Sequence, residues 1–170
     1  MRKSILFLFA IVCAAFMAAQ EQLPKWEKGY LDIHHINTGR GSCAFLILPD
    51  GTNMMIDAGD FDNEAFDAKY APMFAPQVFP NSSYTAGSSI INYLTNVGRD
   101  KLSIDYFLLT HFHSDHYGSV RSVSGTSENG YRLTGLTEVG DGIPIKTYVD
   151  RDYPNYNFPV DLRTNVSGNG

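Results

Sequence analysis

The sequence predicts one domain of mixed helices and strands, class α/β (α+β), that opens with antiparallel strands. Three observations support this class. Short apolar runs separated by turn residues come first, a segment with helical spacing follows, and a continuous apolar run then ends in a cluster of polar side chains. With 170 residues, 44% of them hydrophobic and 13% aromatic, the chain can bury one core.

The first strands are predicted from alternation and turn chemistry. Residues 30–36 alternate weakly between apolar and polar, and apolar strands are expected at 43–48 and 53–57. Pro, Asp and Gly at 49–51 are typical of a turn. The Gly-rich stretch 37–42 joins two strands with no helix after it, so it predicts a tight turn rather than a phosphate-binding loop. The order of these segments predicts a β-meander.

The middle of the chain contains a long aromatic-rich connection at 61–86, in which only 63–70 is expected to form a short helix. This connection is either a lid facing a substrate or an ordered surface loop. Apolar residues with helical spacing predict a helix at 88–97, ending at Gly98. The uninterrupted apolar run 104–109 predicts a buried strand.

The last third of the chain gives weaker signals. A short helix is predicted at 115–123, Gly-rich loops at 125–142 and a strand at 145–150. Residues 151–170 are rich in Pro, Asn and Gly and predict no regular element.

The principal chemical signal follows the buried strand 104–109. It is an H-x-H-x-D-H motif formed by His111, His113, Asp115 and His116. Two histidines at i and i+2 can bind one metal where the backbone curls away from the sheet, and the next Asp and His can reach a second metal. The alternative is a solvated polar loop, but four ligand-type residues at this spacing favour a metal site.

The N-terminus has the pattern of a secretory signal peptide over residues 1–19, followed by a polar leader at 20–29 and a domain from 30 to 170. A membrane anchor is the alternative, but the apolar run is short for a span. The protein is therefore expected to be exported, to the periplasm or outside the cell, with no membrane association after cleavage.

The charge and the cysteines narrow the function further. Loss of Arg2 and Lys3 with the signal peptide leaves 11 basic and 18 acidic residues, a net charge of −7. An acidic surface disfavours nonspecific nucleic-acid binding. The single remaining cysteine, Cys43, lies in an apolar strand and is predicted to be a buried small residue rather than a nucleophile.

Three stretches in order, at 36–42, 56–59 and 87–118, resemble the metallo-β-lactamase superfamily, and within it the ComEC-type metallo-hydrolase domain. The resemblance covers about residues 30 to 120. Asn37 and Ser42 stand where that subfamily usually has acidic residues. The resemblance implies an αββα sandwich, of which this chain supplies mainly the first sheet and its helices.

The resemblance also implies the roles of the site residues. His111 and His113 would bind a first divalent metal, and Asp115 and His116 a second. Zinc is the expected metal, with manganese or iron as alternatives. Asp57 would lie behind the ligands and support the motif loop.

The implied function is hydrolysis by a metal-bound hydroxide, oriented by Asp115 as the catalytic residue. The expected substrate is a phosphodiester or another small molecule, and esters, lactones and lactams also fit. The remaining histidines, His34 and His35, either line the cleft or lie in the core or on the strand surface, and the latter is favoured.

No histidine follows the motif, whereas the family normally supplies further ligands later in the chain. Residues 30–170 are therefore expected to be the N-terminal part of a longer domain. The alternatives are a catalytically incomplete metal-binding remnant and an exported binding module that uses the long aromatic connection. The sequence leaves the oligomeric state open.

Overall fold

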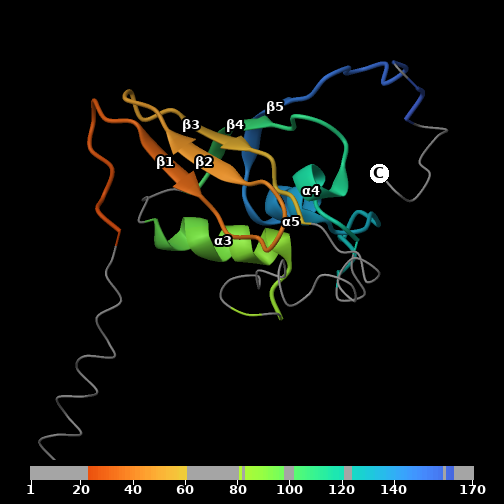
Figure 1. The fold of residues 1–170 in the computed structure, drawn as a ribbon, viewed down its shortest axis with the longest axis horizontal. Coiled ribbons are helices and arrows are strands. Elements are labelled where there is room, and N and C mark those ends of the chain that lie inside the picture. Colours follow the sequence, from red (N-terminus) through yellow and green to blue (C-terminus); the bar gives the residue numbers. More distant parts are fainter. Residues whose placement is uncertain are drawn as a thin grey trace, which may run out of the picture.

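The computed structural model describes residues 23–60, 81, 83–97, 102–120, 124–158 and 160–162 (Figure 1). The predicted signal peptide, the predicted helix at 63–70 and most of the long connection lie outside these residues. Within the described part of the chain, no helix is both long and apolar enough to cross a membrane.

Five strands form one mixed sheet in the order β1-β2-β3-β4-β5. The first three pair antiparallel, and β3, β4 and β5 pair parallel. The predicted meander and both later strands are confirmed, each with slightly shorter bounds. The strands are β1 (Asp32–His35), β2 (Ala44–Ile47), β3 (Asn53–Ile56), β4 (Ile104–Leu108) and β5 (Ile145–Val149).

Three helices accompany the sheet in the described residues: α3 (Ala86–Asn96), α4 (Ser114–Tyr117) and α5 (Gly135–Gly142). Helix α3 confirms the predicted helix but starts two residues earlier, because the Thr85 side chain caps it together with Ser88.

Two predictions about the last third of the chain are wrong. The predicted loop region 125–142 contains α5, whose glycines hid the helical pattern and whose start is capped by Thr134 with Thr137. The predicted helix at 115–123 ends at Tyr117 within the described residues, because the backbone of Gly118 turns to a φ of 95°, and its last positions, 121–123, lie outside them.

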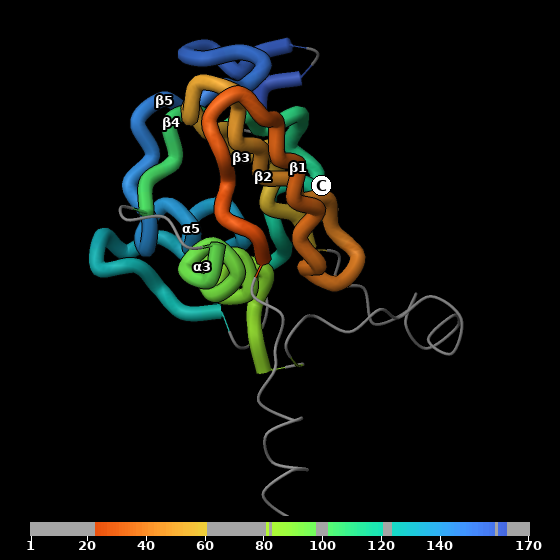
Figure 2. The backbone as a smooth tube through the Cα atoms, turned by 90° about the vertical axis from the view of Figure 1, so that its left-hand side faces the viewer, coloured from red at the N-terminus to blue at the C-terminus, as the bar shows by residue number. Residues whose placement is uncertain are grey.

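The core lies between one face of the sheet and the helices α3 and α5, which lie together on that side (Figures 1 and 2). One row of paired residues, Phe45, Met55 and Phe107, crosses three adjacent strands and is fully buried. Ile90 and Leu94 of α3 pack against it. Burial of these large apolar side chains is the main stabilising contribution of the sheet and helices.

The opposite face of the sheet is also apolar. Ile33, Leu46, Met54 and Tyr106 form a continuous row across four strands, and they alternate with the core residues. Ile33 is 54% exposed and Tyr106 is 45% exposed. Such a face is what the first sheet of a two-sheet sandwich presents.

The parallel pairing of the last three strands indicates where a ligand can bind. The carboxyl ends of β3, β4 and β5 reach the same edge of the sheet, and ligands of α/β sheets bind beyond such an edge. Asp57 follows β3, the motif loop follows β4, and Asp150 follows β5. The turn between β2 and β3 lies at the other edge.

Candidate metal centre

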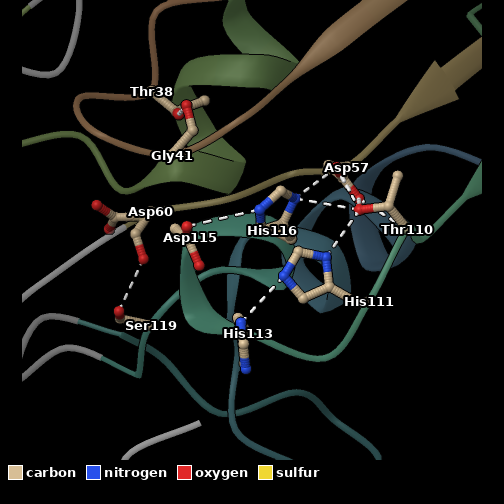
Figure 3. A network of polar contacts seen from close by, with 10 residues as sticks. All are labelled: Thr38, Gly41, Asp57, Asp60, Thr110, His111, His113, Asp115, His116 and Ser119. Atoms are coloured by element: carbon tan, nitrogen blue, oxygen red, sulfur yellow. Dashed lines mark hydrogen bonds and ion pairs between the residues drawn. The ribbon is translucent and has the colours of Figure 1, made fainter.

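The side chains of the motif converge beyond the carboxyl end of β4 (Figure 3). Ligand atoms of His111, His113 and Asp115 all lie within 4.8 Å of one another. This is the one group of three or more potential ligand residues found in the described part of the chain. The Thr110 side chain lies beside it and is hydrogen-bonded within the same network.

The potential ligands form two close pairs. Nε2 of His111 lies 3.0 Å from Nδ1 of His113. Nε2 of His116 lies 3.5 Å from Oδ2 of Asp115. Metal–nitrogen bonds of about 2.1 Å place two ligands of one ion roughly 3.0 to 3.4 Å apart. The His111–His113 spacing lies within this range and the Asp115–His116 spacing lies just beyond it, so a small side-chain shift would let each pair bind one ion.

Asp57 holds the motif loop from behind. Its carboxylate is 2% exposed and accepts hydrogen bonds from the Thr110 amide at 2.9 Å and from the Thr110 hydroxyl. It also accepts a hydrogen bond from Nδ1 of His116 at 2.7 Å. Nδ1 of His116 is therefore the donor to Asp57, and Nε2 is the ring nitrogen that faces Asp115.

The backbone of the motif turn is held by two other loops. The amides of Asp60, Ser42 and Ala58 donate to the carbonyls of three consecutive residues, 114, 115 and 116, at 3.0, 2.7 and 2.8 Å. Helix α4 has only four residues and would be marginal alone. These hydrogen bonds therefore position the motif turn from outside the helix.

Two glycines allow this close approach. A Cβ on Gly59 would lie 1.7 Å from the carbonyl oxygen of Asp115, and a Cβ on Gly41 would lie 1.9 Å from the carbonyl carbon of Gly59. Neither position can accept a side chain without moving the backbone. The sequence predicted a tight turn at 37–42, but its contact with the motif turn could not be inferred from local pattern.

The electrostatics of the cluster favour the neutral form of His111. Burial lowers the pKa of His111, and the neighbouring His116 and His113 lower it further. A neutral imidazole offers a lone pair, which is the form that binds a metal ion. The donor set therefore fits a divalent metal in its spacing, and the lowered pKa of His111 favours the form of that residue that binds a metal.

The two other histidines lie elsewhere. Nδ1 of His34 is 2.9 Å from the Tyr93 hydroxyl of α3, and the ring contacts Phe45, whereas His35 on the same strand is exposed. His34 is half-buried beside the core and His35 lies on the strand surface, so the favoured prediction of core or strand-surface positions is confirmed. Cys43 is buried as predicted, and burial raises its thiol pKa.

A parallel-strand edge with clustered histidines and an aspartate defines the class of the protein, an α/β domain built around a candidate metal centre. A family profile described as the metallo-beta-lactamase superfamily matches residues 37–134, more than half of the chain. The chain belongs to this superfamily, whose members typically bind divalent metals. Comparisons with curated proteins and with solved structures give no match.

Proposed function

We propose that this protein is an exported, metal-dependent hydrolase of the ComEC type that cleaves phosphodiesters. The observation that carries the proposal is the pairing of His111 with His113 and of Asp115 with His116, at spacings of 3.0 and 3.5 Å. Two ligand pairs side by side suit a site for two ions, and such sites hydrolyse phosphate esters. Zinc is the expected metal, with manganese or iron as alternatives.

Each residue has a proposed task. His111 and His113 hold the first ion, and Asp115 and His116 hold the second. When bound, the metals supply a Lewis acid and lower the pKa of water at the site toward about 7. The Asp115 side chain is 45% exposed, so its carboxylate can bind an ion and also orient the attacking water. Asp57 keeps a proton on Nδ1 of His116 and thereby fixes the orientation of that ring.

Metal content is the first test. We expect the purified protein to retain zinc, manganese or iron, measured by elemental analysis, and to lose thermal stability when a chelator removes it. His113→Ala should reduce the metal content. His35→Ala is the matched control, because His35 is an exposed histidine on β1 and should leave the content unchanged. Absence of metal in the wild type after reconstitution would overturn the proposal.

Turnover is the second test. The metal-loaded protein should hydrolyse bis(p-nitrophenyl) phosphate, and Asp115→Ala should abolish this activity. If metal binds but neither this diester nor p-nitrophenyl acetate is hydrolysed, the protein is a non-catalytic metal-binding domain instead.

Export rests on the signal-peptide pattern of residues 1–19. N-terminal sequencing of the protein recovered from the native host should find Gln20 as the first residue. Recovery of the intact N-terminus inside the cell would contradict export and would leave the metal chemistry untouched.

A further inference from the structure

A third segment reaches the metal-centre edge, because β5 runs parallel to β4 and ends beside it. The Leu109 amide, just before the motif, donates to the Val149 carbonyl at 2.9 Å. The chain then continues from Asp150 and passes along the motif loop. In Figure 1 this segment is the blue chain leaving the end of β5. None of its residues has a role in the proposed metal centre.

The segment contacts the motif through Phe112, the residue between the two histidines of the first pair. The Phe112 ring makes an edge contact with Tyr156, with centroids 5.7 Å apart. The Arg151 guanidinium lies 5.8 Å from the centre of the same ring. Because Phe112 directly follows His111 and directly precedes His113, Arg151 and Tyr156 contact a side chain of the same short backbone segment that carries the first ligand pair.

The segment is a folded loop and not a loosely attached chain. The Asp150 carboxylate accepts hydrogen bonds from the Tyr156 hydroxyl at 2.5 Å and from the Tyr153 amide at 3.1 Å. The Asp152 carboxylate accepts one from the Asn157 amide at 2.8 Å. The hydrogen bond to Asp150 raises the pKa of Tyr156 to about 12, so this hydroxyl stays protonated. The conformation of the loop is therefore fixed by its own hydrogen bonds and does not depend on a ligand.

The outer surface of this loop carries side chains that are exposed and contribute little to its packing. Tyr153 is 80% exposed, although its ring lies 6.3 Å from that of Tyr156. Arg151 is exposed, and within the described residues no carboxylate forms an ion pair with it. A contact with an aromatic ring uses none of the guanidinium N–H donors for a conventional hydrogen bond, and these donors match the oxygens of a phosphate.

We propose that Arg151, supported by Phe112, and the exposed ring of Tyr153 form a recognition surface for a small phosphodiester that carries a flat aromatic group. Arg151 binds the anionic phosphate oxygen, and Tyr153 stacks on the aromatic group. This inference rests on the proposed function and names its substrate class. A neutral ester, lactone or lactam has no anionic oxygen for Arg151 to bind.

The overall charge favours a small substrate over a polymer. Without the predicted signal peptide the chain has 11 basic and 18 acidic residues, a net charge of −7, which repels a polyanion along its length. One guanidinium is sufficient for the single charge of a small diester. The surface therefore fits a ligand with one phosphate and one aromatic ring better than the extended phosphate backbone of a nucleic acid.

The test compares two probes that share a leaving group, the anionic bis(p-nitrophenyl) phosphate and the neutral p-nitrophenyl acetate. Arg151→Ala should raise KM for the diester about tenfold and leave KM for the acetate unchanged. Arg151→Lys should give an intermediate value, because it keeps the charge but loses the fork of donors. Tyr153→Ala should raise KM for both probes severalfold, since both carry the ring.

The matched controls are Lys28→Ala and Tyr30→Ala. Both residues are exposed, and they flank Gly29, which is hydrogen-bonded to Pro49 in the turn at the opposite edge of the sheet. Neither control should change KM for either probe. All variants should retain the wild-type metal content, so that a KM effect reports recognition and not loss of the metal.

A binding measurement separates this inference from the proposed function. Calorimetry on metal-free protein should show that Arg151→Ala binds the diester about tenfold more weakly than the wild type. If the wild type hydrolyses the diester but Arg151→Ala behaves like Lys28→Ala in both assays, the recognition surface is wrong and the hydrolase stands. If no probe is hydrolysed but diester binding depends on Arg151, the hydrolase is wrong and the surface stands. Stronger binding of a single-stranded oligonucleotide than of the diester would overturn the small-substrate assignment.

Discussion

Two aspartates tie β3 to β4, one at each end of this strand pair. Near the start of β4, the Asp105 carboxylate accepts hydrogen bonds from the Asn53 amide at 2.8 Å and from the Lys146 ammonium at 2.5 Å. At the other end, Asp57 accepts hydrogen bonds from Thr110 and from His116. The same residue type joins the same strands, but only one of the two carboxylates contacts a potential metal ligand.

The difference comes from the direction of the strands. Parallel strands place all their carboxyl ends at one edge, so the loops after β3, β4 and β5 meet there. At that edge Asp57 is 2% exposed and its backbone has a positive φ of 60°. At the other edge Asp105 is 19% exposed and its lysine partner 64% exposed. The site edge therefore carries unusual and tightly packed backbone, whereas the opposite edge uses ordinary surface contacts.

The largest expected effect is that of adding a methyl group at the site edge. Gly59→Ala would place its Cβ 1.7 Å from the Asp115 carbonyl oxygen, so the motif turn must move. We expect a loss of about 3 kcal/mol or more in the free energy of unfolding, together with weaker metal binding. Urea denaturation and metal titration measure the two effects.

The matched variant at the opposite edge is Gly51→Ala. Gly51 has a φ of 90°, and its added Cβ would lie 3.3 Å from the Trp26 ring. The positive φ alone predicts a loss of about 1 to 2 kcal/mol with unchanged metal affinity. Equal effects of the two substitutions on stability and on metal binding would show that the site edge is no more tightly packed than the turn.

The next largest effect compares the two aspartates by the same substitution, Asp to Asn, at each end of the strand pair. Asp57→Asn leaves one acceptor oxygen and replaces the other with an NH₂ group that only donates, so either Thr110 or His116 loses its acceptor. We expect a stability loss of about 2 kcal/mol and a ten- to hundredfold weaker metal affinity. Asp105→Asn should cost about 1 kcal/mol and leave metal affinity unchanged. A weaker metal affinity in the Asp105 variant would contradict the division between the two edges.

The smallest expected effect is on the pH dependence of stability and comes from His34. Its ring is hydrogen-bonded to a tyrosine hydroxyl, whereas that of His116 is hydrogen-bonded to the Asp57 carboxylate. Burial lowers the pKa of His34 below 6.5, although the charge of Asp32 opposes this shift, and the hydrogen-bond partner of His34 is the Tyr93 hydroxyl. The unfolded chain then binds more protons than the folded chain, so stability should fall as the pH drops below about 6.5.

Melting temperatures measured from pH 7.5 to pH 5 test this expectation. His34→Phe should flatten the decline on the acid side, because it removes the half-buried titrating group. His35→Gln is the control on the same strand and should keep the decline, since the His35 side chain is exposed. An unchanged pH profile in His34→Phe would assign the acid sensitivity to other groups.

Much of the fold could be predicted, because its signals are local. Strands β2, β3 and β4 each appear as a short apolar run beside turn residues, and α3 appears as helical spacing followed by a glycine. Helix α5 was missed because three of its eight residues are glycines, which are poor helix formers. Its Thr134 and Thr137 capping pair was the available signal, and packing against α3 and the sheet supplies the rest.

The sequence by itself determined the composition of the candidate metal centre. His111, His113, Asp115 and His116 lie within six residues, so any turn after β4 brings them together. Only the tertiary structure decided how they are held and which atoms face one another. Asp57 lies 53 residues before Thr110, and the amides that hold the motif turn come from two other loops. Such contacts depend on parallel pairing between distant strands, for which a single sequence contains no local pattern.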